Sequence, residues 1–388
     1  MALNNEVLDL GNLQFYWRMT TKPNFPTNVV SDFLPFAFTY DASNCLIKQQ
    51  TNQLVLDSLE RIYKENYNVG YLQEGHSLAE AYGNDFIEII EKSITQYNPT
   101  LKEIREIGAG GCYILKKLKS KGYKVSALDP SPVAHEKGKE FGIEVYQEFY
   151  PTKSKLPQAD MYIHYDVLEH VEDPVGFLAH HYKELSENGL VVFAVPDCTS
   201  YIENGDISMI LHEHINYYDK ESLTIIARKA GFKVHDVVKA NYGGVLYCIA
   251  QKLNNYKANI DDQLTDVSKF TEFVTKHKKL IVKINSFITN AQQANKSVGF
   301  YIPLRSIPYL SILGVKQNIR FFDDDGGIYG KYFDGFPIAV ENFADLQKKP
   351  VDSLLVLSFA FGEKIKQKVL ATISSSIDVK TISNLASE

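Results

Sequence analysis

A glycine-rich turn is the first part of the sequence whose residue types suggest chemistry. Glu106 closes a short predicted strand, and Gly108, Gly110 and Gly111 follow it before a predicted helix. Glycines at such a turn let a ligand approach the backbone closely and leave helix N-terminal amides exposed to an anion. Many turns of this kind bind nothing, so the turn alone does not predict a ligand.

A carboxylate at the end of the next predicted strand strengthens the case. Asp129 stands where an acidic residue commonly accepts hydrogen bonds from a ribose hydroxyl pair. The turn and Asp129 together predict an adenosine-containing cofactor, either NAD(H) or S-adenosylmethionine. Glu106 favours S-adenosylmethionine, because its carboxylate suits the methionine ammonium and would repel a pyrophosphate. The expected cofactor-binding residues are Glu106, Gly108, Gly110, Asp129, Pro130 and Asp166.

Two histidine-containing segments follow. One is Asp166-Val-Leu168-Glu-His170, and the other contains the triplet His212-Glu213-His214. Histidine transfers protons well near neutral pH, and a neighbouring carboxylate can orient the ring or raise its basicity. Other readings stay open: His214 as a surface-loop residue, His170 as a capping or packing residue, and the triplet as metal ligands. Adjacent side chains reach one ion only with difficulty, which disfavours the last reading.

These residues fall within an alternation of predicted strands and helices. Strands are predicted over 103–107, 123–128, 143–146, 160–164 and 190–195, and helices over 113–121, 132–141 and 175–185. This alternation predicts an α/β fold with a parallel, doubly wound sheet. A helix over 223–231 and a last strand over 244–251 complete it.

The rest of the chain is predicted to flank that sheet. A strand-like stretch covers Leu46–Val55, residues 56–97 are predicted to be helical, and a second α/β pattern ends in a strand over Ile377–Ile382. The predicted divisions are an N-terminal lobe (1–60), a central domain (61–255), a linking helix (256–295) and a C-terminal α/β lobe (296–388).

Composition narrows the class of protein. The 388 residues carry a net charge of −6, and the four cysteines are scattered. An acidic balance argues against nucleic-acid and membrane-surface partners. No apolar run is long enough to span a bilayer, and the first residues lack a secretory signal pattern, so we expect a cytoplasmic protein. The oligomeric state stays open.

Over roughly residues 75–250 the sequence resembles class I methyltransferases, with Asp160–Pro174 and Val191–Pro196 matching their later half. A narrower resemblance is to the deoxysugar C-methyltransferases, which methylate nucleotide-linked 4-ketosugars in antibiotic and polysaccharide pathways. It rests on Glu213-His214-Ile-Asn-Tyr-Tyr-Asp, Asp166-Val-Leu168-Glu-His170 and Tyr242-Gly243-Gly244. Val7–Gly11 and Phe322–Ile338 extend it to both ends of the chain.

The resemblance implies a Rossmann-like sheet flanked by a small N-terminal lobe and a second α/β lobe at the C-terminus. It implies an S-adenosylmethionine-dependent transferase acting on a dTDP-, GDP- or CDP-linked ketosugar. His214 would be the base, Glu213 and His170 nearby site residues, and Tyr71, with Tyr67 as a rival, would close the site. In that reaction, removal of a proton from the carbon next to the ketone leaves an enolate, which attacks the methyl group of the cofactor. No metal is expected, because hydrogen-bond donors can stabilise the enolate oxygen.

Two departures from the family pattern stand out. The family's N-terminal lobe carries zinc on four cysteines, whereas only Cys45 lies there, so we expect apolar packing around Leu8, Phe15, Trp17 and Leu46 instead. The family's substrate loop is replaced by Tyr301–Ser306. Sugar O-methylation and a non-catalytic protein with a relict nucleotide-sugar site therefore remain as alternatives.

Overall fold

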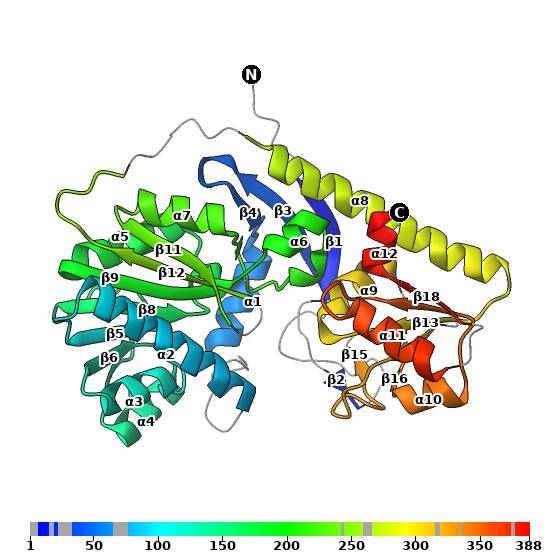
Figure 1. The fold of residues 1–388 in the computed structure, drawn as a ribbon, viewed down its shortest axis with the longest axis horizontal. Helices are drawn as coiled ribbons and strands as arrows, with labels where there is room; N and C mark the ends of the chain where they lie inside the picture. Colours follow the sequence, from blue (N-terminus) through cyan, green and yellow to red (C-terminus); the bar gives the residue numbers. More distant parts are fainter. Residues whose placement is uncertain are drawn as a thin grey trace.

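Two α/β lobes lie side by side with the N-terminal strands between them (Figure 1). The computed structural model describes residues 7–14, 19–21, 33–64, 77–241, 244–258, 266–314, 319–333, 336–373 and 377–388. Helix α8 (Ser268–Gln293) runs from the N-terminal strands across the C-terminal lobe. Among the described residues, no helix is both long and apolar enough to cross a bilayer.

The larger lobe is built on a seven-stranded sheet with the order β11-β12-β9-β8-β5-β6-β7. Its strands are β5 (Glu103–Ile107), β6 (Lys124–Leu128), β7 (Glu144–Tyr146), β8 (Ala159–Tyr165), β9 (Leu185–Pro196), β11 (Lys233–Lys239) and β12 (Val245–Gln251). β5 to β9 pair in parallel, and β11 and β12 add an antiparallel edge. The helices of this lobe are α2 (Ser77–Tyr97), α3 (Tyr113–Ser120), α4 (Pro132–Phe141), α5 (Pro174–Glu184) and α7 (Lys220–Lys229). The predicted doubly wound α/β sheet is confirmed, although β11 was not expected.

The N-terminal strands form a separate antiparallel sheet with the order β1-β3-β4-β10. Its members are β1 (Leu8–Gln14), β3 (Phe33–Asp41), β4 (Leu46–Gln49) and β10 (Asn216–Tyr217). The predicted strand over Leu46–Val55 is wrong beyond Gln49, because α1 (Gln53–Lys64) begins four residues later and Asn52 accepts a hydrogen bond from the Val55 N–H. β10 comes from the sequence of the larger lobe, so this sheet joins the two parts of the chain.

The C-terminal lobe has a parallel sheet with the order β16-β14-β13-β17-β18. Its strands are β13 (Val298–Tyr301), β14 (Ile319–Phe322), β16 (Val340–Glu341), β17 (Ser353–Val356) and β18 (Asp378–Thr381). Its helices are α9 (Ile307–Leu313), α10 (Phe343–Lys348), α11 (Gly362–Thr372) and α12 (Ile382–Ser387). The predicted final strand stops at Thr381, because the Thr381 hydroxyl caps α12 by accepting from the Asn384 N–H. A short pair of β2 (Met19–Thr20) and β15 (Tyr332–Phe333) lies beside this lobe.

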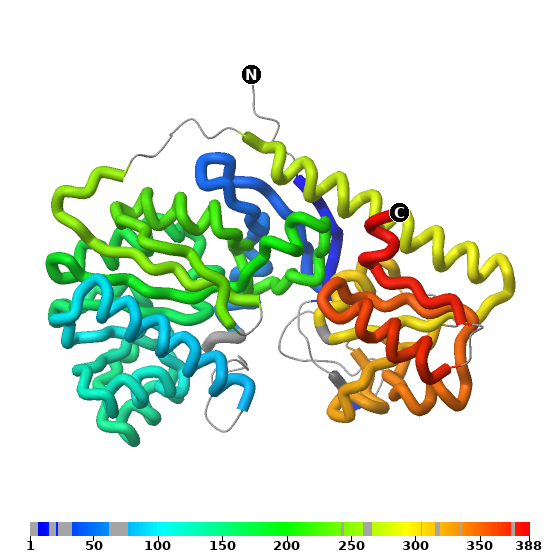
Figure 2. The backbone as a smooth tube through the Cα atoms, in the orientation of Figure 1, coloured from blue at the N-terminus to red at the C-terminus, as the bar shows by residue number. Residues whose placement is uncertain are grey.

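One hydrophobic core joins the N-terminal strands, α8 and the C-terminal lobe. Along β3, Leu34, Phe36 and Phe38 alternate inward and are at most 1% exposed. The Phe38 ring packs edge-on against Tyr217 of β10 and Phe273 of α8, with centroids 5.0 and 5.3 Å away. Figure 2 shows these blue strands between the green and the orange parts of the chain. The strands therefore hold the two lobes together.

Of the residues predicted to pack the N-terminal lobe, Leu8 belongs to this core, whereas Leu46 packs in a core of the larger lobe. Leu8 and Leu46 are buried, as expected, and Cys45 is buried too. Phe15 and Trp17 lie outside the described residues. That the lobe holds no structural zinc stays a prediction.

Phe38→Ala should lower the free energy of unfolding by about 3–5 kcal/mol, because it leaves a cavity where three elements meet. Urea unfolding followed by circular dichroism measures the loss. Phe361→Ala is the control, since the Phe361 side chain is largely exposed and its removal should cost little. Equal effects of the two substitutions would contradict the central place given to Phe38.

Candidate active site

The glycine-rich turn connects β5 to α3 at the carboxyl edge of the sheet. Gly108 has a φ of +73°, and its N–H donates to the Leu128 carbonyl over 3.0 Å. A Cβ atom on Gly108 would lie 2.7 Å from Cγ2 of Val167. Glycine is thus required both by the backbone conformation and by the close approach of the β8 end. The turn remains narrow and presents bare backbone at this edge.

Asp129 is tied to that turn. One carboxylate oxygen accepts from the Gly110 N–H and the other from the Ser131 N–H, each over 2.8 Å. Pro130, between them, is exposed at the start of α4. The structure thus brings the predicted pair of Gly110 and Asp129 into direct contact, with the carboxylate held in one orientation.

Glu106 is buried below the same turn. Its side chain is 2% exposed, and its Oε2 has no hydrogen-bond partner among the described residues. Burial raises the pKa of this carboxyl well above its usual range, and the nearby charge of Asp129 raises it further. A buried carboxyl group with an unpaired oxygen is costly unless a donor or a cation meets it.

The two histidine-containing segments are held together by hydrogen bonds. Helix η2 (Leu168–His170) follows β8, and the Ile215 N–H donates to the Glu169 carbonyl over 2.7 Å. The Asn216 amide donates to the carbonyls of Leu168 and Val171, and the Tyr218 hydroxyl also donates to Leu168. Residues 211–218 are thereby fixed against the end of β8.

His170 and His214 meet within this frame. Their ring centroids lie 5.0 Å apart at an angle of 78°. The Nδ1 atom of His170 lies 2.7 Å from the Glu213 carbonyl oxygen. A carbonyl only accepts, so Nδ1 carries the proton and Nε2 is the basic nitrogen of the neutral ring. The predicted grouping of His170, Glu213 and His214 is thus close in space.

Burial sets the protonation state of His214. It lowers the pKa of His214 well below its usual range, and the charges of His170 and Arg305 lower it further. His214 is therefore neutral near pH 7, which is the form that accepts a proton. The neighbouring His212 points elsewhere: its Nε2 contacts the Leu34 carbonyl, and its ring packs on Phe36. The triplet accordingly does not act as one set of ligands.

Two acidic residues complete the cluster. Asp166 follows the end of β8 with a φ of +52° and is exposed. Partial desolvation by the atoms around its carboxyl raises its pKa, the charge of Glu213 adds to the rise, and the charge of Arg305 opposes it. Glu169 is 1% exposed, and neither of its carboxylate oxygens has a hydrogen-bond partner among the described residues. Glu169 was not predicted as a site residue, because the sequence gives no sign that its side chain is buried.

The C-terminal lobe contributes a positive charge. Arg305 lies in η4 (Leu304–Ser306), which follows β13, and its side chain is exposed. Its charge lowers the pKa of both Asp166 and His214, so it stands near the cluster. In the sequence, Tyr301–Ser306 differs from the family's substrate loop, and this difference does not by itself predict Arg305 as a site residue. Tyr71, Tyr67, Tyr242 and Gly243 lie outside the described residues.

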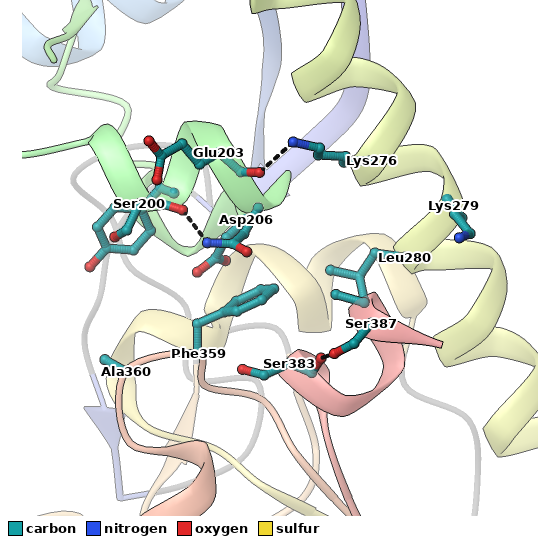
Figure 3. A pocket seen from close by; sticks show the side chains of 13 residues that line it. Ser200, Glu203, Asp206, Lys276, Lys279, Leu280, Phe359, Ala360, Ser383 and Ser387 are labelled. Atoms are coloured by element: carbon teal, nitrogen blue, oxygen red, sulfur yellow. Dashed lines mark hydrogen bonds between the residues drawn. The ribbon is translucent and has the colours of Figure 1, made fainter.

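A cavity of about 730 Å³ lies at the junction of the lobes, apart from this cluster. It is bounded by α6 (Thr199–Asn204), α8, the loop at Phe359 and α12 (Figure 3). None of the predicted site residues lines it. Its walls combine Lys276 and Lys279 with Glu203 and Asp206 and contain no histidine among the described residues. The acid–histidine cluster is therefore the better candidate for chemistry.

One protein-family model matches most of the predicted central domain. The family model described as "Methyltransferase domain" matches residues 80–237, which span the sheet edge and the cluster. The comparison with curated proteins found no match.

Solved methyltransferase structures resemble part of the chain. One is the N-methyltransferase NodS from Bradyrhizobium japonicum WM9 in complex with S-adenosyl-L-homocysteine. It is 15% identical, with a TM-score of 0.38, covering 51% of this chain and 98% of that one. Another is 1,6-didemethyltoxoflavin-N1-methyltransferase from Burkholderia thailandensis. It is 13% identical, with a TM-score of 0.41, covering 60% and 100%. At these values the likeness says nothing about the substrate.

The doubly wound sheet and the family match define a class I methyltransferase domain with the expected Rossmann-like fold. Residues 80–237 therefore form a methyltransferase domain, and the protein is a methyltransferase.

Asn216→Ala should lower the free energy of unfolding by about 1–3 kcal/mol, because the carbonyl of Val171 loses its buried donor. Urea unfolding measures this. Asn204→Ala serves as the control, because Asn204 is exposed and its amide bonds only within its own short helix. An unchanged free energy in Asn216→Ala would mean that the two segments are not held together in this way.

Proposed function

We propose that the enzyme methylates a carbon atom of a nucleotide-linked 4-ketosugar. A carbon next to a ketone is acidic enough for a positioned side chain to remove its proton. The C–H electron pair then forms an enolate, whose carbon takes the methyl group. S-adenosylmethionine, when bound, supplies an electrophilic methyl whose bond to sulfur breaks as the new carbon–carbon bond forms. The observation that carries the proposal is the neutral, buried His214 beside Glu213 and His170 at the sheet edge.

The residues at the carboxyl ends of β5 and β6 fit the cofactor. The unpaired oxygen of Glu106 suits the methionine ammonium, and the bare backbone at Gly108 and Gly110 allows close approach. Asp129, held by two backbone amides, is oriented to accept from the ribose hydroxyls. Pro130 and Asp166 complete the proposed lining, at the ends of β6 and β8.

The pair of Glu213 and His214 is proposed to supply the base. His214 is the first candidate, because it is neutral and lies between the sheet edge and the C-terminal lobe. His170 is proposed to assist it, and Glu213 is the second candidate for the base. Arg305, an exposed residue whose charge acts on His214, suits an anionic substrate such as a nucleotide diphosphate. That charge favours a nucleotide-linked sugar over a neutral one.

The proposal is tested by incubating the protein with S-adenosylmethionine and a panel of dTDP-, GDP- and CDP-linked 4-ketosugars, followed by mass spectrometry and NMR. A product 14 mass units heavier (one CH2, by composition) without a methoxy signal is expected. A methoxy signal would replace C-methylation by O-methylation. No product with any ketosugar, from protein that binds S-adenosylhomocysteine, would overturn the proposed substrate class.

Asp129→Ala should weaken S-adenosylhomocysteine binding, because each ribose hydroxyl loses a charged acceptor worth about 1.5–3 kcal/mol. Isothermal titration calorimetry measures this. Asp129→Asn separates the loss of charge from loosening of the Gly110 turn, and Asp378→Ala, on an exposed residue of the other lobe, is the control. Unchanged affinity in both Asp129 variants would remove the role of Asp129. Tight NADH binding would contradict the cofactor itself.

His214→Asn should reduce turnover by about 10²- to 10⁴-fold while S-adenosylhomocysteine affinity stays near wild type, as expected for loss of a general base. Glu213→Gln should lose less if Glu213 only orients the ring, and as much if Glu213 is the base. Deuterium wash-in next to the ketone, without methyl donor, reports proton removal directly. Exchange and turnover at the wild-type rate in His214→Asn would place the base elsewhere, with His170 next. His180→Asn, on an exposed helical residue, is the control.

We expect S-adenosylhomocysteine binding to the wild type to release a proton from Glu106, and Glu106→Gln should abolish this release. The raised pKa of Glu106 means that this carboxyl is partly protonated before binding, and an adjacent ammonium favours the charged form. Affinity should therefore rise with pH up to that raised pKa and then level off. Calorimetry in buffers of different ionisation enthalpy measures the protons released. Equal release by wild type and variant would rule out contact between Glu106 and the ammonium.

A further inference from the structure

Three potential metal ligands converge at the end of β8. One ligand atom from each of Glu169, His170 and His214 lies within 4.8 Å of the other two. The Nε2 atom of His170 lies 3.9 Å from Oε1 of Glu169, which is too far for a hydrogen bond. Two ligands of one metal ion lie roughly 3–4 Å apart, given bonds of about 2.0–2.2 Å. The distance between Glu169 and His170 thus suits two ligands of one ion better than a direct contact.

The His170 ring is oriented as metal-binding histidines commonly are. Its Nδ1–H donates to the Glu213 carbonyl, so the basic Nε2 is directed toward Glu169. Histidine ligands of metals commonly donate their second ring N–H to a backbone carbonyl, which fixes the tautomer and the ring. The backbone that provides this carbonyl is itself held to η2 by the bond from Ile215 to Glu169.

Glu169 gives an independent reason to expect a cation. Both of its oxygens lie buried without a hydrogen-bond partner among the described residues, near the carboxyl of Asp166, which is exposed. Burying an uncompensated carboxylate is costly, and buried charges are normally paired or bound to a metal.

We propose that Glu169, His170 and His214 bind one divalent transition-metal ion at the substrate side of the methyltransferase domain. Two imidazoles and one carboxylate suit zinc, manganese, iron(II) or cobalt(II), and three protein ligands leave coordination positions open. This inference does not depend on the sugar, and it makes Glu213 rather than His214 the base of the proposed function. It also differs from the sequence-based expectation that the enzyme needs no metal.

A bound ion would assign distinct roles to the two neighbouring residues. As a Lewis acid, the ion would hold a substrate oxygen and stabilise negative charge on it. His214 would then give its lone pair to the metal, and proton removal would pass to Glu213. A larger loss of proton removal in Glu213→Gln than in His214→Asn would therefore agree with a metal ion bound at His214.

The test uses the full chain after EDTA treatment and removal of the chelator. Calorimetric titration with ZnCl2 and with MnCl2 should show one strong site per chain for at least one of these ions. CoCl2 should give visible absorption bands of a nitrogen- and oxygen-ligated ion. Glu169→Gln and His170→Asn should each weaken binding by about 100-fold or more, since even the loss of outer partners costs 10- to 100-fold.

Matched controls are Glu172→Gln and His180→Asn, which change exposed residues nearby in sequence and should bind metal like the wild type. Thermal unfolding of each variant by circular dichroism shows whether it folds, and Glu169→Gln keeps the side-chain size. Absence of a stoichiometric site in the wild type would overturn the proposal, as would wild-type affinity in folded Glu169→Gln. Because no methyl acceptor is present, either result leaves the ketosugar assignment to its own experiment.

Discussion

The geometry of the candidate active site depends on a small set of hydrogen bonds between the end of β8 and residues 211–218. These segments are far apart in sequence, yet the Ile215 N–H, the Asn216 amide and the Tyr218 hydroxyl all donate to carbonyls of residues 168–171. The same segment pairs with β4 through β10, so the N-terminal sheet supports the site from outside. Without these bonds, neither histidine would have a fixed position relative to the sheet edge.

Burial of acidic groups is the second feature of this edge. Glu106 and Glu169 are both buried at or next to the ends of β5 and β8, and burial raises the pKa of each. A protein dedicated only to stability would avoid such a concentration of carboxyl groups, because each is costly to desolvate. A site that receives cationic ligands can recover this cost when they bind. The cluster is therefore consistent with a positively charged cofactor and with a metal ion.

The sequence predicted the parallel sheet well because its strands and helices alternate with clear hydrophobic periods and glycine stops. It also placed Glu106 and Asp129 correctly at neighbouring strand ends, since that position follows from the order of elements. It did not predict the burial of Glu169 or the approach of Arg305. Both result from contacts between distant segments, and no local pattern encodes them. The two-residue strand β10 was missed for the same reason.

The two lobes contribute differently to the candidate site. The central domain has a fold and a family match that define its chemistry, whereas the C-terminal lobe contributes a parallel sheet, Arg305 and one wall of the junction cavity. The N-terminal strands share a core with that lobe, so its position relative to the catalytic edge is fixed by packing around residues such as Phe38 and Phe273. This packing is what allows a residue of one lobe to act on groups of the other.

A crystal structure of the protein with S-adenosylhomocysteine tests the central claim most directly. The account predicts the adenosine ribose on Asp129, the homocysteine ammonium on Glu106, and the sulfur open toward His170 and His214 with the bonds from residues 215–218 intact. A cofactor bound with its sulfur facing away from the histidines, or a rearranged segment 211–218, would contradict it.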